Sequence, residues 1–181
     1  MPDSITNISV PQQFAQQQQE IPAEVVPLPS RGVVYPQGSA LYNKDTVGIR
    51  AMTARDEDIL TSRALLKNGK AIPTLLSNCM VDKAVDTGKM LAGDRNAVLI
   101  GIRITGYGAD YRVELTCPSC TAKISQDIDL SSLPIKRIPE GVFPIRENTN
   151  EFEFILPVSG KKVTFNLMTG EDEQELLSTY E

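Results

Sequence analysis

Two cysteines stand three positions apart in the segment Cys117-Pro118-Ser119-Cys120, a spacing typical of turns that bind zinc. A structural zinc ion takes four ligands, normally from two such turns, because tetrahedral coordination closes the ion off from water. The chain has three cysteines and no histidine, so it carries half of such a site. Three interpretations are open: a turn without metal, a zinc site completed by a third thiolate and a carboxylate or by another chain, and a labile disulfide.

The ligand count favours the metal-free turn, so we expect no cofactor, with a zinc ion shared with another chain as the alternative. The remaining thiol, Cys79, lies on a predicted apolar helix face and is interpreted as a small buried hydrophobe. A thioredoxin-like role is disfavoured, because in that chemistry the cysteine pair opens a helix that lowers the pKa of the first thiol. Here residues 121–130 alternate like a strand instead.

The absence of histidine also restricts catalysis. Without an imidazole the chain has no Ser-His or Cys-His nucleophile pair and no ordinary proton shuttle at neutral pH. Its Asp and Glu residues concentrate at predicted helix starts and on alternating strand positions, where a solvated role explains them. We therefore expect a protein that is not an enzyme.

Charge and hydropathy restrict the classes of partner. The chain has 18 Lys and Arg against 23 Asp and Glu, a net charge of −5, and no basic cluster, which argues against nucleic acid. No apolar run reaches the roughly 20 residues that cross a bilayer. The N-terminus lacks the layout of a secretion signal, so we expect no membrane partner and synthesis in a cytosol.

The N-terminal quarter differs in composition from the rest. Residues 1–27 include the polar tract QQFAQQQQE and are predicted to be a flexible low-complexity tail, and residues 28–45 an extended proline-rich arm. The arm is more apolar than a spacer needs to be, which favours a surface that binds a partner. The alternative is that it packs on its own domain. The predicted contact residues are Leu28, Pro29, Ser30, Arg31, Gly32, Val33, Val34, Tyr35 and Pro36.

Residues 46–140 are predicted to form a core of strand and helices. After a strand around Val47, a first helix is capped by Thr53 and stops near Asn68, a second begins near Pro73, and a third is capped by Asp94. The apolar positions of the second helix recur at helical spacing. These positions are Ile72, Leu75, Leu76, Cys79 and Met80.

Two hairpins are predicted after the helices. YRVELT and KISQDIDL flank the CxxC turn, and EFEFILP and KKVTFNL flank a Ser-Gly turn within residues 141–181, which end in the start of a helix. The helices and the strands come in separate runs rather than in regular alternation. The sequence therefore predicts an α+β fold with central helices, antiparallel hairpins and an extended N-terminal arm.

One strand-to-helix corner occurs twice. RAMTARDEDILTS at residues 50–62 and NLMTGEDEQELLS at residues 166–178 share M-T-x-x-D-E-x-x-L-x-S, with an offset of 116 residues. Each copy contains a capping box, in which a Thr and an acidic residue three positions later bond each other's backbone. We interpret this as a duplicated unit in preference to convergent use of one stable corner, and we expect a longer source protein because the second copy stops early. The predicted helix-capping residues are Thr53, Asp56, Thr169 and Asp172.

Three stretches carry a family resemblance: LPSRGVVYPQGSALYN, TVGIRAMTARDEDILTSRALLKNG and GDRNAVLIGIRITGYGADYRVELTCPSC. In this order they resemble the baseplate proteins of contractile-tailed, T-even-like bacteriophages, the hub or hub-assembly proteins, over residues 28 to about 178. The resemblance implies a further C-terminal helical segment, so we expect either a longer source protein or a family member without this segment.

The resemblance implies a structural part of the baseplate hub region. It also implies contacts with other tail and baseplate proteins in a symmetric hetero-oligomeric assembly, and a location in the virion tail after assembly in the host cytoplasm. The alternatives are an assembly chaperone that grips tail components such as the tape-measure protein and then leaves, and a small zinc-knuckle binding module.

Overall fold

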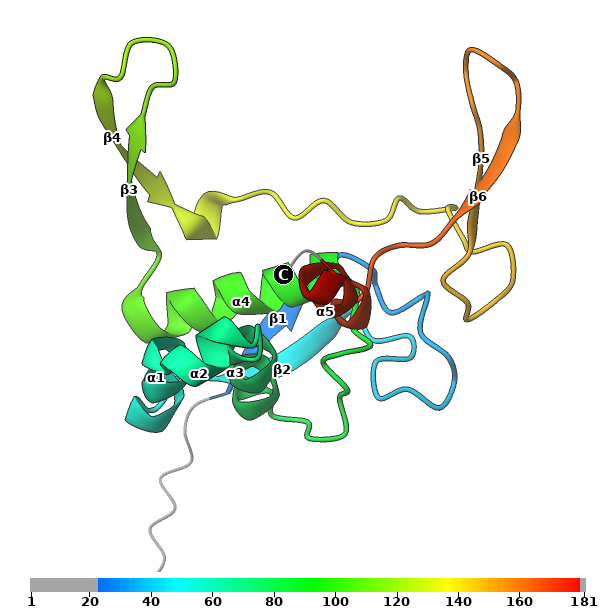
Figure 1. Cartoon of the computed structure of the whole chain (residues 1–181). Coiled ribbons are helices and arrows are strands. Elements are labelled where there is room, and N and C mark those ends of the chain that lie inside the picture. Colours follow the sequence, from blue (N-terminus) through cyan, green and yellow to red (C-terminus); the bar gives the residue numbers. More distant parts are fainter. Residues whose placement is uncertain (1–22, 180–181) are drawn as a thin grey trace, which may run out of the picture.

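The computed structural model describes residues 23–179, and its helices and antiparallel strands confirm the predicted α+β fold class (Figure 1). In chain order the elements are β1 (Ala23–Pro27), β2 (Thr46–Arg50), α1 (Ala54–Thr61), α2 (Arg63–Lys67), α3 (Ala71–Cys79), α4 (Ala92–Tyr107), β3 (Asp110–Thr116), β4 (Lys123–Asp129), the short 3₁₀ helix η2 (Leu130–Ser132), β5 (Phe152–Ile155), β6 (Lys162–Phe165) and α5 (Gly170–Thr179). The described strands form three separate two-stranded antiparallel sheets, which pair β1 with β2, β3 with β4 and β5 with β6.

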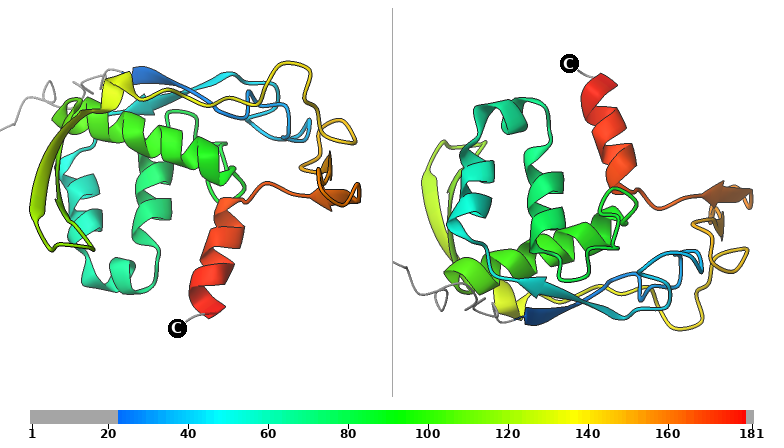
Figure 2. Two further views of the ribbon diagram at one scale, coloured as in Figure 1. Left: turned by 90° about the horizontal axis from the view of Figure 1, so that it is seen from above. Right: turned by 90° about the horizontal axis from the view of Figure 1, so that it is seen from below.

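Helix α4 is the centre of the body. Figure 2 shows the β1–β2 ribbon on one side of α4 and the helices α1, α3 and α5 on the other. Gly101 of α4 lets the helix approach the ribbon closely, because a Cβ there would lie 2.5 Å from Cγ2 of Val26. Any larger side chain at this position would push α4 away from β1.

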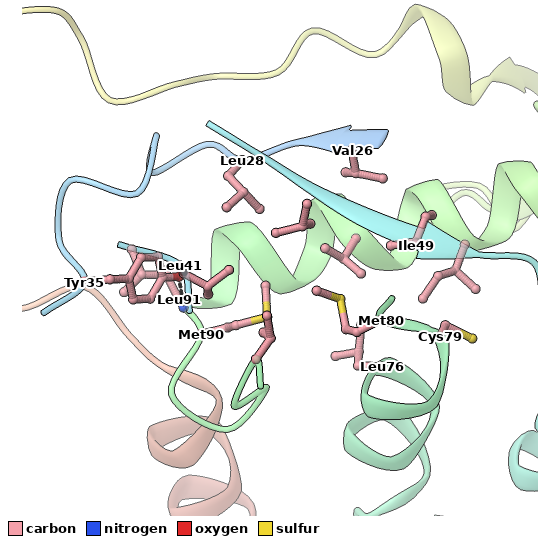
Figure 3. Packing of buried hydrophobic residues seen from close by; sticks show 14 of the residues in the cluster. Val26, Leu28, Tyr35, Leu41, Ile49, Leu76, Cys79, Met80, Met90 and Leu91 are labelled. Carbon is pink, nitrogen blue, oxygen red and sulfur yellow. Dashed lines mark hydrogen bonds between the residues drawn. The ribbon is translucent and has the colours of Figure 1, made fainter. Parts of the chain in front are cut away.

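The hydrophobic core fills the space between the ribbon, α3 and α4 (Figure 3). Of the apolar positions predicted for the second helix, all except Ile72 are buried. Burial of a large apolar side chain stabilises the fold by about 1.5–3 kcal/mol. The core residues are Val26, Leu28, Val34, Tyr35, Leu41, Val47, Ile49, Leu75, Leu76, Cys79, Met80, Val85, Met90, Leu91, Val98, Ile102 and Phe152.

Two predicted helix boundaries are wrong. The helix expected from Thr53 to Asn68 is divided into α1 and α2 by Ser62, whose ψ of 108° is extended. The predicted third helix begins at Ala92, so Asp94 is its third residue and not its cap. An acidic side chain is favourable throughout the first turn of a helix, so the sequence pattern could not separate these two positions.

Both hairpins project from the same side of the body, and residues 133–151 run between them (Figure 1). In the first, Tyr111 faces Ile128 across the strands. In the second, Phe152 faces Phe165, and their rings stack with centroids 5.7 Å apart. Phe152 is buried, so this pair ties the base of the second hairpin to the body.

The N-terminal part of the described chain is a strand followed by turns. Residues 1–22, most of the predicted flexible tail, lie outside the described residues, whereas residues 23–27 form β1. Residues 28–45 form a series of turns that returns the chain to β2, closed by a 2.8 Å hydrogen bond from Leu28 N–H to the Asp45 carbonyl. This segment therefore packs on its own domain.

Candidate functional site

The segment 28–36, predicted to bind a partner, is fastened to the start of α4 by a buried carboxylate. Asp94 accepts hydrogen bonds from the Ser30 backbone N–H at 2.8 Å, the Ser30 hydroxyl at 2.6 Å and the Tyr35 hydroxyl at 2.6 Å. The Tyr35 hydroxyl in turn accepts a bond from Leu91 N–H at 3.0 Å. Burial, and then the charge of Asp94, raise the pKa of Tyr35, so its hydroxyl stays a donor.

Most of these predicted contact residues face the interior of the same chain. Leu28, Ser30, Gly32, Val34 and Tyr35 are buried. The residues of this segment that reach solvent are Pro29, Arg31, Val33 and Pro36. A partner can therefore touch this segment along one face only.

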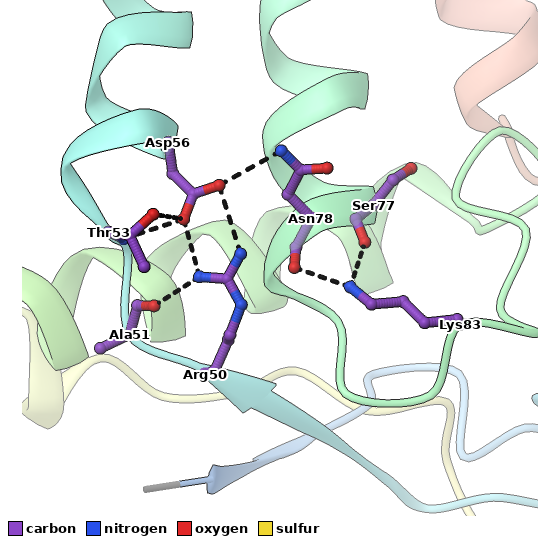
Figure 4. A network of polar contacts seen from close by, with 7 residues as sticks. All are labelled: Arg50, Ala51, Thr53, Asp56, Ser77, Asn78 and Lys83. Carbon is purple, nitrogen blue, oxygen red and sulfur yellow. Dashed lines mark hydrogen bonds and ion pairs between the residues drawn. The ribbon is translucent and has the colours of Figure 1, made fainter. Parts of the chain in front are cut away.

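The first strand-to-helix corner is built around Asp56, whose side chain is 2% exposed (Figure 4). Its carboxylate accepts bonds from the Thr53 N–H and hydroxyl, both at 2.8 Å, and forms an ion pair with Arg50 at 2.7 Å. Asn78 of α3 donates a further bond at 3.2 Å. Burial alone would raise the pKa of Asp56, but the bonds from Arg50, Thr53 and Asn78 hold it well below its usual range.

The second corner repeats the capping geometry at the surface. Asp172 accepts bonds from the Thr169 N–H and hydroxyl, both at 2.8 Å, and the Thr169 hydroxyl accepts from Asp172 N–H at 3.3 Å. The bond from the Thr169 N–H, and then that from its hydroxyl, lower the pKa of Asp172. Arg95 of α4 forms an ion pair with Glu173. This ion pair connects the second corner to the start of α4.

The two cysteines of the CxxC turn lie at the tip of the first hairpin, with Cys120 exposed and Cys117 half-buried. Hydrogen bonds to the Cys117 sulfur from the backbone N–H groups of Cys120 and Ser119, and then from the Cys120 side chain, lower the pKa of the Cys117 thiol.

Cys79 is buried in the core on α3, where burial raises the pKa of its thiol. Within residues 23–179 no three Cys, Asp or Glu side chains come together as a metal site. The alternative of an intrachain site with a third thiolate and a carboxylate therefore has no support among residues 23–179, because Cys79 packs into the core.

Each projecting hairpin has an apolar face that the described part of the chain leaves uncovered. Alternation along the strands places five apolar side chains on one face of β3–β4, and the β5–β6 hairpin exposes further large apolar groups. The predictions named these strands but did not name their side chains as contact residues. The residues are Tyr111, Val113, Leu115, Ile124 and Ile128 in the first hairpin and Phe154, Val163 and Phe165 in the second, whereas Ile155 is exposed on the opposite face of the second hairpin.

A third apolar surface is a groove of about 500 Å³ between α5 and the α2–α3 end of the body. Leu176 and Leu177 of α5 contribute to its wall and are 46% and 59% exposed. Leu66 and Leu99 lie among the lining residues contributed by the body.

None of the helices in the described range is long and apolar enough to span a bilayer.

Comparison with known families places these surfaces in context. Residues 36–150 match the model of the T4 bacteriophage base plate protein family, so the chain belongs to this family of phage baseplate proteins. Comparisons with curated proteins and with solved structures found no match. Family membership implies a location in the virion tail and contacts with other tail and baseplate proteins.

The matched range contains α1 to α4 and the CxxC hairpin, together with most of the turns before β2. It is narrower than the resemblance noted over residues 28–178. The second hairpin and α5 lie outside it.

Proposed function

We propose that this protein is a structural component of the baseplate hub region, which joins a symmetric hetero-oligomeric assembly through protein contacts and not through catalysis. The observation that carries the proposal is the pair of projecting hairpins with uncovered apolar faces. A two-stranded hairpin is marginally stable by itself, and its apolar face is expected to be covered by a third strand or another surface. In this protein a neighbouring baseplate subunit is the proposed cover.

The exposed side chains are large enough to drive such a contact. Leu115 and Ile124 at the end of the first hairpin are 57% and 51% exposed, and Phe154 and Phe165 of the second are 53% and 44% exposed. Full burial of one such side chain stabilises a complex by about 1.5–3 kcal/mol. Each strand also leaves one edge without a described partner, which can accept a strand from a neighbour.

The segment 28–36 supports the same assembly in a different way. Because Asp94 holds Ser30 and Tyr35, the half-buried Pro29, Arg31 and Val33 and the exposed Pro36 form a fixed surface rather than a flexible one. A preformed surface loses less conformational entropy on binding. We propose that other tail proteins, the tape-measure protein among them, meet the chain in the host cytoplasm as the tail is built.

Hairpin variants test the contact. We expect Leu115→Ser and Phe154→Ser to leave the free energy of unfolding nearly unchanged, because both side chains are exposed, and to reduce the yield of complete tails at least tenfold. Glu114→Gln is the matched control, since Glu114 is a neighbour of Leu115 that points to the opposite face of the sheet. Normal tail yield from both hairpin variants would contradict the proposal.

The composition of purified virions tests whether the protein is retained. Quantitative mass spectrometry should find the chain at a fixed ratio to the other baseplate subunits. If tails need the chain for assembly but purified virions lack it, the structural proposal is overturned in favour of a transient assembly chaperone.

A further inference from the structure

We propose that Cys117 and Cys120 bind zinc, and that a second copy of this chain supplies the other two ligands through the same residues. The site would be a tetrahedral four-thiolate centre between the tips of two β3–β4 hairpins. This inference does not depend on the proposed role in the hub.

Two backbone hydrogen bonds of Cys117 close the turn. The Cys117 N–H donates to the Ala122 carbonyl at 2.9 Å, and Thr121 N–H donates to the Cys117 carbonyl at 2.9 Å. Thr121 has φ of +58°, a left-handed conformation that is uncommon for residues other than glycine. These bonds hold the chain in a tight loop, so the two cysteines have a fixed relation to each other.

The ligand count requires a second chain. Zinc bound by thiolates takes four ligands, whereas the chain has three cysteines and no histidine. Cys79 cannot join the pair, because it is fully buried in the core on α3. Another copy is the one source of two further accessible thiols that the protein itself provides.

The position of the turn allows two copies to meet. It lies at the far end of a hairpin that projects from the body, so two tips can approach without a collision between bodies (Figure 1). Identical half-sites related by a two-fold axis form a closed, self-complementary contact. Each zinc ion bound in this way would displace the protons of four thiols, so binding weakens as the pH falls.

Zinc content and mass test the proposal on the full chain kept reduced with a phosphine. With zinc added and the excess removed, we expect half a zinc ion per chain by elemental analysis and a dimer by native mass spectrometry. Chelation should return the protein to a monomer. Cobalt substitution should give the visible absorption bands of a tetrahedral thiolate site.

Variants assign the ligands. Cys117→Ser and Cys120→Ser should each lower retained zinc at least tenfold and abolish the zinc-linked dimer. Ser119→Ala, in the same turn, should keep both, because its backbone N–H remains. Leu115→Ser should also keep both, which separates this site from the apolar contact of the same hairpin.

Three results would overturn the proposal. They are the absence of retained zinc in the wild type, one zinc ion per monomeric chain, and a zinc-linked dimer that survives both cysteine substitutions.

Discussion

The two strand-to-helix corners share a sequence motif and a capping geometry but differ in their surroundings. In the first, Asp56 is buried and is bonded by Arg50 and by Asn78 of another helix. In the second, Asp172 is exposed and is bonded by Thr169 of its own corner. The comparison teaches that a capping box specifies where a helix starts, whereas tertiary contacts decide how strongly that start is held.

The difference extends to the helices that follow. Leu60 of α1 packs against the core, and α1 lies against α3. Leu176 holds the corresponding position in α5, 116 residues later, and is 46% exposed beside the groove. The same offset replaces Arg50 by Asn166, which cannot form an ion pair with the capping carboxylate.

The largest effect is expected from Asp56→Ala. The change removes the cap and leaves the mostly buried Arg50 without its partner, so the free energy of unfolding should fall by about 3 kcal/mol. Urea unfolding at pH 7 measures this loss. Asp58→Ala, at an exposed position of the same helix, is the control and should change little. A loss no greater than that of Asp172→Ala would remove the distinction between the corners.

A smaller loss is expected from Arg50→Asn, which gives the first corner the residue of the second. Asp56 would keep its bonds from Thr53 and Asn78, so we expect a loss of about 2 kcal/mol, within the usual range for a hydrogen bond to a charged group. The double variant with Asp56→Ala should lose less than the sum of the two single changes, because both remove one interaction. Additive losses would show that the ion pair does not couple these residues.

We expect the pH dependence of the free energy of unfolding to reflect the ionised carboxylate of the first corner. Because the folded pKa of Asp56 lies below its unfolded value of 3.8, its contribution is present above that value and is lost as the pH falls toward the folded pKa. The stability difference between wild type and Asp56→Asn should therefore narrow between about pH 5 and about pH 2. Urea unfolding across this range measures it, and a constant difference would argue against the ionised pair.

The smallest effect is expected from Asp172→Ala. The carboxylate is exposed and solvent screens its charge, so the change should disturb the start of α5 more than the stability of the whole chain. Hydrogen exchange of the first amides of α5 should accelerate, whereas those of α4 should not. Equal acceleration in α4 would mean that the second corner supports the body as firmly as the first.

The sequence was sufficient for features that depend on neighbouring residues. Both capping boxes follow from a Thr and an acidic residue three positions apart, and both hairpins follow from alternation around a turn. The burial of Asp56 in the first corner could not be predicted from neighbouring residues, because its partner Asn78 is 22 residues away in the chain. Distance along the chain also concealed the role of Asp94, whose partner Ser30 is 64 residues away.

The start of the described chain was misread for a related reason. Residues 23–27 form β1, although they were predicted to belong to the flexible low-complexity tail of residues 1–27. Proline is tolerated on an edge strand, and Pro27 lies at the end of β1 in a two-stranded sheet. The burial of Tyr35 likewise depends on its bonds to Asp94 and Leu91 at the start of α4. These partners are far from Tyr35 in the sequence, so no local pattern predicts its burial.

The two hairpins stand on one body and extend to the same side of it (Figure 1). In the proposed assembly, a neighbour that binds one hairpin brings its second binding surface within reach of the other at a high effective concentration. Avidity of this kind lets two weak contacts act as one strong contact, and it is lost when the spacing of the two surfaces on the neighbour is wrong. In the proposed assembly, the distance between the hairpins therefore favours neighbours whose two binding surfaces have the matching spacing.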